Sequence, residues 1–205
     1  MKKVLVMLGV MLFSASAFAM NQEAMNGKTC EEEKAAFEKY ATNQRTDFVV
    51  QNILINMADP MIHMTDEQAQ PLATCYATYK VKGRDFTAFV RDNAGIFPGD
   101  IKGKEKAELL AFADRVDFLS EKAELDRVVA QGNESFIVQH ILGNMIDPME
   151  KMTDAQAAPK AKVYAALKVK GMALTEFVRA HSNDYTMDVE IEMESFANRV
   201  ERLAK

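Results

Sequence analysis

Methionine is the residue type whose spacing in this chain points to chemistry. Two triplets share the pattern Met-x-x-x-Met-x-x-Met: Met57, Met61 and Met64 in the first, and Met145, Met149 and Met152 in the second. Side chains three and four positions apart share one face of a helix, so each triplet can bring its thioether sulfurs together. Soft thioethers select Cu(I). His63 can join the first triplet, whereas Lys151 stands at the matching place in the second.

The same triplets have two interpretations that need no metal. The first triplet continues the apolar stripe formed by Val50, Ile53 and Leu54, which indicates a core-facing helix. Methionine fills irregular gaps in such a core. A methionine-lined groove for a peptide or a small apolar ligand is the other possibility. We expect core packing and keep the groove and the copper site as alternatives.

The remaining residues show few patterns that indicate catalysis. None of His63, His140 and His181 has a second ligand at a zinc spacing. No nucleotide-binding loop, dinucleotide fingerprint or nucleophile elbow is present. Residues 181–184 (HSND) hold the residue types of a catalytic triad, but triads are assembled in space and rarely from sequence neighbours. We therefore predict a protein that is not an enzyme and has no cofactor.

Two cysteines, Cys30 and Cys75, predict one disulfide if the protein is exported to an oxidising compartment. Two separate thiols are the alternative. The chain contains an internal repeat, described below, in which Phe118 and Val163 occupy the matching positions. A pair that is Cys/Cys in one copy and apolar in the other fits two positions that touch in a core.

The first residues have the three parts of a secretory signal peptide. Lys2 and Lys3 precede the apolar run 4–13, and the segment ends in the A-x-A site 17–19. The apolar run is shorter than the ~20 residues that span a bilayer. We predict cleavage near Ala19, a short N-terminal extension over 20–29, and a periplasmic or secreted protein without a membrane anchor. A retained N-terminal anchor is the alternative.

The charge of the exported chain argues against two classes of partner. Removal of Lys2 and Lys3 leaves 23 Lys+Arg against 30 Asp+Glu, a net charge of −7. Nucleic acids and anionic lipids both require clustered cations. We therefore expect neither as a partner.

An internal repeat organises the rest of the chain. Residues 48–91 match residues 136–179 at a constant offset of 88, with 27 identities in 44 positions and no gap. After a loop containing Pro and Gly the match resumes at an offset of 84, where the motif FA-x-RV at 112–116 recurs at 196–200. The first copy therefore has four extra residues in its loop.

Helix-favouring composition and helical periodicity predict an all-α fold. We expect a tandem duplication of a four- to five-helix unit, with unit 1 at 30–117 and unit 2 at 118–205. These would form two small bundles, packed together or joined by one long helix. The stretch between Lys104 and Gln131 has no Gly or Pro, which favours a continuous helix of about 28 residues; a break at Ser120 is the alternative.

Local signals place the other elements of the first unit at helices 30–42, 46–58 and 65–82, a short helix at 86–90 and a longer one at 109–119. Pro60 ends the second of these, with Asp59 as the N-cap of the next turn. Thr65 opens a capping box, and Gly83 ends the helix that follows. In the second unit, residues 188–194 alternate like a strand but continue a helical stripe, so we predict helix.

Several polar residues are identical in the two copies of the repeat, and we expect them to have structural roles. Asn56 and Asn144 stand next to the methionine stripe, and if they are buried they need hydrogen-bond partners. We expect Lys80, Lys82, Lys168 and Lys170 to lie at helix C-termini, where cations are favoured.

The leading functional hypothesis is an exported, non-enzymatic helical protein that binds another protein or peptide, as a chaperone, inhibitor or immunity protein does. The alternatives are a Cu(I)-handling protein that uses the methionine triplets and a carrier of a small apolar ligand.

Overall fold

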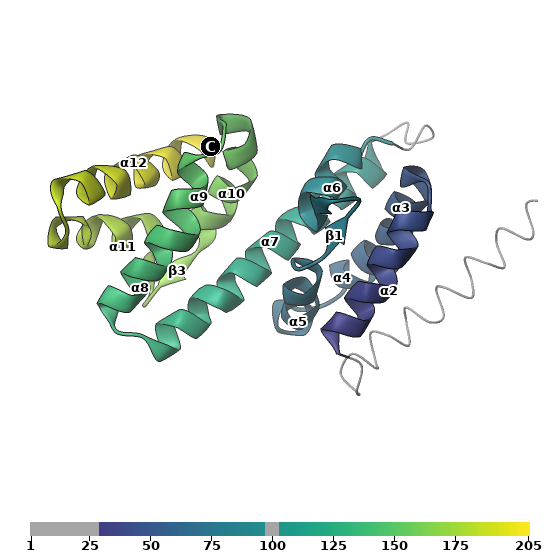
Figure 1. Ribbon diagram of the computed structural model, residues 1–205, viewed down its shortest axis with the longest axis horizontal. Helices are drawn as coiled ribbons and strands as arrows, with labels where there is room; N and C mark the ends of the chain where they lie inside the picture. Colours follow the sequence, from purple (N-terminus) through teal and green to yellow (C-terminus); the bar gives the residue numbers. More distant parts are fainter. Residues whose placement is uncertain (1–28, 97–102) are drawn as a thin grey trace, which may run out of the picture. The chain divides into compact units, whose positions relative to one another are not determined.

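The computed structural model describes residues 29–96 and 103–205 (Figure 1). These residues are mostly helical, as the sequence predicts, and the few strands are two residues long. None of the helices in the described ranges has the length and apolarity needed to cross a membrane. The predicted signal peptide at 1–19, most of the extension at 20–29 and part of the Pro/Gly loop lie outside the described residues.

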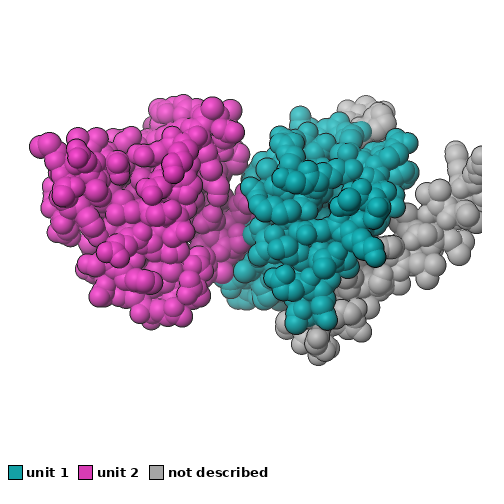
Figure 2. Space-filling view, viewed as in Figure 1, with its two compact units in different colours: residues 1–116 teal, residues 117–205 magenta. Residues whose placement is uncertain are grey.

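The chain divides into two compact units between Val116 and Asp117 (Figure 2). The elements of the first unit are α2 (Cys30–Asn43), α3 (Thr46–Ile53), the π-helix η1 (Leu54–Ala58), α4 (Asp59–Ile62), α5 (Asp66–Tyr76), β1 (Lys80–Val81), β2 (Arg84–Asp85), α6 (Phe86–Asn93) and the first part of α7 (Lys104–Gln131).

The second unit begins within α7, which runs without a break through Ser120. It continues with α8 (Glu134–Ile141), the π-helix η2 (Leu142–Ile146), α9 (Asp147–Glu150), α10 (Asp154–Ala166), β3 (Lys168–Val169), β4 (Met172–Ala173), α11 (Leu174–Ala180), the 3-10 helix η3 (Ser182–Asp184) and α12 (Met187–Leu203). From α8 onward the elements follow the order seen from α3 onward in unit 1, apart from η3, which has no counterpart among the described residues of unit 1. The strand-like stretch 188–194 is helical, as predicted.

The prediction that Pro60 ends a helix is wrong, because the backbone adapts to the proline. The π-helix η1 connects α3 directly to α4, and the Asp59 N–H donates to the Leu54 carbonyl, five residues back. A wider turn accommodates the missing donor and the ring of Pro60. Asp59 lies in the helical conformation and is not an N-cap. Asp147 donates to Leu142 in the same way in unit 2.

The expected helix 65–82 is too long. It begins at the Thr65 capping box but ends at Tyr76, and a two-residue hairpin follows. Lys82 and Gly83 form its turn with φ of 51° and 79°, the positive pair that a tight hairpin turn requires. Gly83 therefore forms a turn and does not end a helix. Lys80 and Lys82 lie in the hairpin and not at a helix C-terminus. The same geometry recurs at Lys170 and Gly171.

The two units fill their cores with different side chains. In unit 1 five aromatic rings pack with centroid separations of 5.5–6.2 Å: Phe37, Tyr76, Tyr79, Phe86 and Phe112. The positions that the repeat offsets assign to them in unit 2 are Leu125, Tyr164, Leu167, Leu174 and Phe196. All five of these belong to one buried cluster, which is largely aliphatic.

Candidate functional site

The methionine triplets lie mainly in the cores of their units. Met57 and Met61 are buried, as are Met145 and Met149, while the last methionine of each triplet is half-buried. His63 is exposed. The second triplet contributes to the buried cluster of unit 2. This placement favours the packing interpretation.

An arginine from the last helix of each unit binds the main chain of the triplet. Arg115 of α7 donates to the carbonyls of Met61 and Met64, the latter at 2.8 Å, and to the Asp66 carboxylate at 2.8 Å. The Met61 carbonyl, in the last turn of α4, also accepts from the Met64 N–H at 3.2 Å, and Met64 itself follows that helix. One guanidinium therefore joins the end of α4 to the start of α5.

Unit 2 has the same arrangement around Arg199. This side chain donates to the carbonyl of Met149, to that of Met152 at 2.6 Å, and to Asp154 at 2.9 Å. Arg202 adds a bond to the other oxygen of Asp154 at 2.8 Å. Hydrogen bonds from both arginines lower the pKa of the Asp154 carboxyl. The repeated FA-x-RV motif contains both central arginines, but sequence reasoning did not assign them this role.

These contacts bear on the copper hypothesis. The main chain of each triplet is already bound, and its first two side chains are packed. Within the described ranges, moreover, His, Cys, Asp and Glu form no group of three that could hold a metal ion. Copper binding through the sulfurs stays a prediction. A Cu(I) titration of the triple variant M57L/M61L/M64L against the unmodified chain tests it, and equal affinities would end it.

Cys30 and Cys75 lie at disulfide distance, with their sulfur atoms 2.09 Å apart and their Cα atoms 5.6 Å apart. The pair joins α2 to α5. In unit 2, Val163 is buried in the core and Phe118 packs against it. A cysteine pair at disulfide distance in one unit thus stands where the other has two apolar residues of the core.

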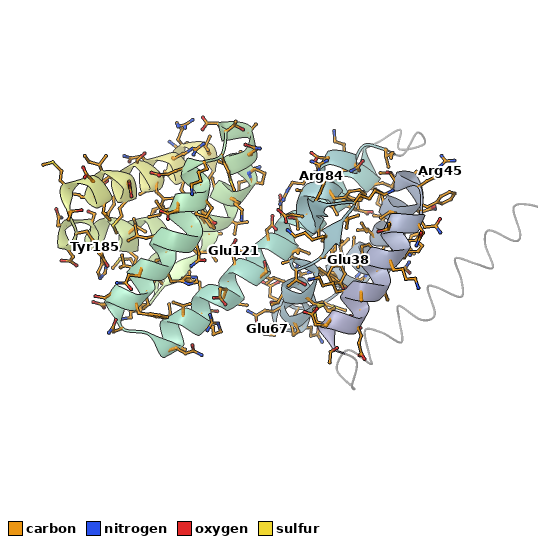
Figure 3. The ribbon with its side chains drawn as sticks, viewed as in Figure 1. Glu38, Arg45, Glu67, Arg84, Glu121 and Tyr185 are labelled. Carbon is orange, nitrogen blue, oxygen red and sulfur yellow. A yellow bond between two sulfur atoms is a disulfide. The ribbon has the colours of Figure 1, made fainter. Side chains whose placement is uncertain are left out.

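Of the shared polar residues, Asn56 lies in the environment considered from the sequence, whereas Asn144 and the hairpin lysines do not. Asn56 is buried, but Asn144 is exposed and donates to the His140 carbonyl at 3.0 Å. Lys82 of the first hairpin donates to the Gln44 carbonyl at the end of α2, at 2.8 Å. Glu38 of α2 accepts from the backbone of the same hairpin at 2.7 Å (Figure 3). These contacts position the hairpin against α2.

Phe48 is a candidate binding residue that sequence reasoning missed. It is 41% exposed near the start of α3, on the side away from the core. The Arg45 guanidinium lies 5.6 Å from the ring centroid (Figure 3), and an ion pair to Asp47 at 2.8 Å holds that guanidinium. The ring therefore has a cation on one face and an open apolar edge.

Phe136 occupies the matching position in unit 2 and is 48% exposed. Its ring packs on Gly132, where an added Cβ would lie 2.4 Å from Phe136 Cδ1. Beside it, Glu134 pairs with Lys170 of the second hairpin at 3.0 Å and with His181 at 3.5 Å. Hydrogen bonds from these two groups lower the pKa of Glu134.

Phe48 and Phe136 differ from the other exposed apolar residues, because the same residue type is exposed at both matching positions. Six large apolar side chains of the described ranges are exposed. At four of these positions the matching position of the other unit holds a different residue type: Ile62, Met172, Met187 and Ile191. Only Phe48 and Phe136 are exposed and identical. The sequence carried a signal for this, because Phe48 falls outside the apolar stripe of α3.

Comparisons with protein-family models, with curated proteins and with solved structures found no match for this chain.

Proposed function

We propose that this chain is an exported, non-enzymatic helical protein that binds another protein or peptide, through one exposed phenylalanine on each unit. The observation that carries the proposal is the exposure of Phe48 and Phe136 at matching positions. An exposed aromatic ring beside fixed polar groups is typical of a binding surface, since such rings dominate the energetics of protein interfaces.

Export and duplication complete the proposal. The N-terminal pattern predicts a cleaved signal peptide, and a cysteine pair at disulfide distance fits an oxidising compartment. The 88-residue repeat and the similar order of elements support descent of both units from one ancestral unit. Two related units offer two sites for one kind of apolar side chain, so a partner with two such side chains gains affinity from both.

Site-specific photo-crosslinking tests this function. A photoreactive residue at position 48 or 136, in chain purified from the exported fraction, should crosslink one and the same partner from a periplasmic or secreted extract. The double variant F48S/F136S should lose that partner. I62S is the matched control, because Ile62 is 49% exposed outside both sites. A partner retained by F48S/F136S, or lost equally by I62S, would refute the assignment.

A further inference from the structure

Three charged or titratable side chains from three elements of unit 2 meet beside Phe136. Glu134 lies in the first turn of α8, His181 follows the last turn of α11, and Lys170 lies in the turn of the second hairpin. His181 Nε2 lies 3.5 Å from Glu134 Oε2, and Lys170 Nζ lies 3.0 Å from Oε1 of the same carboxylate. One carboxylate can therefore be held by two cations at once.

The other ring nitrogen of His181 determines what Nε2 can do. Nδ1 lies 2.9 Å from the Phe177 carbonyl oxygen, and because a carbonyl oxygen only accepts, Nδ1 carries the hydrogen. In the neutral ring Nε2 is then an acceptor that turns its lone pair towards a carboxylate oxygen. In the charged ring Nε2 is a donor, and the contact with Glu134 becomes an ion pair. The contact is thus favourable for the charged ring and unfavourable for the neutral ring.

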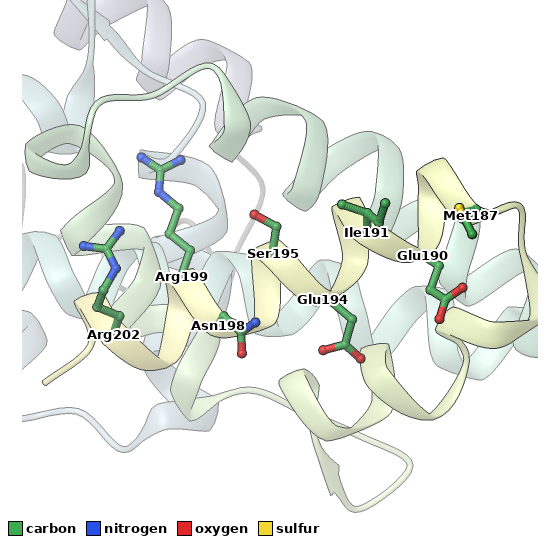
Figure 4. Close-up of a pocket in the computed structure, with 8 residues that line it drawn as sticks. All are labelled: Met187, Glu190, Ile191, Glu194, Ser195, Asn198, Arg199 and Arg202. Atoms are coloured by element: carbon green, nitrogen blue, oxygen red, sulfur yellow. The ribbon is translucent and has the colours of Figure 1, made fainter.

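Charged groups also lie on the other elements around His181. Arg179 of α11 pairs with Glu201 of α12 and, at 3.4 Å, with Glu194, which lines an open groove on that helix (Figure 4). Asp184 of η3 follows three residues after the histidine, and its backbone N–H donates to the His181 carbonyl at 3.3 Å. The carboxylate that faces the ring nitrogen is the one from α8.

Unit 1 has the same hydrogen bond at this helix end but no titrating group in it. At the offset of 88, Asn93 stands at the position of His181, and it donates to the Phe89 carbonyl at 2.8 Å, four residues back, as the histidine does. Thr46 stands where Glu134 stands in unit 2. Amide and hydroxyl groups do not change charge near neutral pH, so the pH-sensitive contact is particular to unit 2.

We propose that protonation of His181 clamps the first turn of α8 and thereby strengthens the binding of a partner at Phe136, whereas the Phe48 site has no such control. Phe136 lies in the same turn as Glu134, and its N–H donates to the Asn133 side chain at 3.0 Å. When the ring is charged, α11 and the hairpin both hold this turn; when it is neutral, the hairpin alone holds it. A side chain that is held before binding loses less freedom on binding. The effect on binding rests on the proposed function, but the clamp itself does not.

The clamp requires that Glu134 stay ionised where the histidine gains its charge. Hydrogen bonds from Lys170 and then from His181 lower the pKa of the Glu134 carboxyl. Histidine changes charge between about pH 5 and pH 8, which lies above the range in which this carboxyl takes up a proton. We therefore expect the clamp to be closed at about pH 5.5 and open at about pH 8.

NMR spectroscopy of the isotope-labelled exported chain tests the clamp without any partner. Between about pH 5 and pH 8 the amide signal of Phe136 should shift along the same curve as the ring signals of His181, and the amide signal of Phe48 should not. H181N, which introduces the residue of unit 1, and E134Q should both reduce the shift at Phe136 to that at Phe48. H63N is the matched control, because His63 is exposed and belongs to unit 1. A Phe136 signal that does not follow the His181 titration, or that follows it unchanged in E134Q, would overturn the clamp.

Photo-crosslinking then tests the control of binding. The yield of crosslinked partner at position 136, divided by the yield at position 48, should be about two- to fivefold higher at about pH 5.5 than at about pH 8, as a partly exposed ion pair allows. H181N should make this ratio independent of pH. A constant ratio in the unmodified chain, with the NMR titration intact, would overturn the control of binding. Loss of the crosslink at both positions, with the titration intact, would refute the binding function and with it this control, while the clamp would stand.

Discussion

The two units solve one packing problem with different chemistry. Three of the five core aromatic positions of unit 1 are leucines in unit 2, and the cysteine pair of unit 1 corresponds to two apolar residues. At two further matching positions, unit 2 places a Lys160–Glu121 ion pair at 3.1 Å, where unit 1 has Leu72 and Glu33. Both units retain the arginine that binds the methionine carbonyls. The fold therefore depends on the helix ends more strictly than on the type of core side chain.

The tyrosines show how far the two cores remain alike. Burial, followed by the nearby Glu33 carboxylate, raises the pKa of Tyr76 in unit 1. Burial, followed by Glu121 and Asp117, raises the pKa of Tyr164 in unit 2. Each core thus keeps one buried phenol beside a glutamate of its first helix, although the rings around it differ.

The largest difference between the units should come from the cysteines. The variant C30A/C75A should lose about 2–4 kcal/mol of unfolding free energy, because a cross-link between residues 45 apart restricts the unfolded chain. Hydrogen exchange by mass spectrometry should show the loss mainly in α2 and α5. The converse variant, F118C/V163C in that background, should form the equivalent link in unit 2, as free-thiol titration would report. Equal losses of protection in both units would contradict this view.

The arginines should show the opposite, a shared dependence. R115M and R199M should each cost about 1–3 kcal/mol, since each removes the arginine donor from two main-chain carbonyls, of which Met61 or Met149 keeps a backbone N–H. Denaturant unfolding measures the total, and hydrogen exchange over 59–66 or 147–154 assigns it to a unit. R91M, which removes an arginine bound to the Asp114 side chain at 2.8 Å, is the control. A cost in one unit alone would show that the two arrangements are not equivalent.

A smaller effect is expected from the ion pair that only unit 2 has. K160L introduces the residue of unit 1, and we expect a change within about 1 kcal/mol, because the pair is partly exposed. A double-mutant cycle with E121Q isolates the coupling between the two side chains. A coupling well above this range would mean that unit 2 relies on the pair as unit 1 relies on its cysteines.

The smallest effect concerns pH. The pKa of Asp154 is lowered in the folded chain by Arg202 and Arg199, so this carboxylate stabilises the fold above its unfolded pKa. That contribution is lost as the pH falls below about 4 through the folded value. D154N should therefore flatten the acid limb of the stability curve measured by denaturant titration. If stability falls in the same way at acid pH in D154N and in the unmodified chain, Asp154 does not contribute to the pH dependence.

Sequence reasoning predicted the elements that depend on local signals. The capping box at Thr65, the helical period through residues 188–194 and the uninterrupted stretch 104–131 each led to the observed helix. It failed where the backbone departs from the common geometry. Pro60 predicts a helix end unless a π-turn is considered. Lys82 and Gly83 also predict a helix end, unless lysine adopts a positive φ as it does here.

The candidate sites also differ in how far the sequence predicts them. The cysteine pair could be proposed from spacing and from the apolar residues at the matching positions. The role of Arg115 could not, because its partners are carbonyls 51 and 54 residues away in the chain. The exposure of Phe48, by contrast, could have been predicted, because Phe48 falls outside the apolar stripe of α3.

The uninterrupted helix α7 has a consequence for folding cooperativity. Its buried residues Leu109 and Val116 belong to one unit, and Leu125 and Val128 to the other. Starting a helix is the unfavourable step, whereas extending one is not. Whichever unit folds first therefore supplies a nucleated end from which the other can grow its first helix. We expect two units with separate cores to unfold as coupled neighbours, as adjacent repeats do in a one-dimensional array.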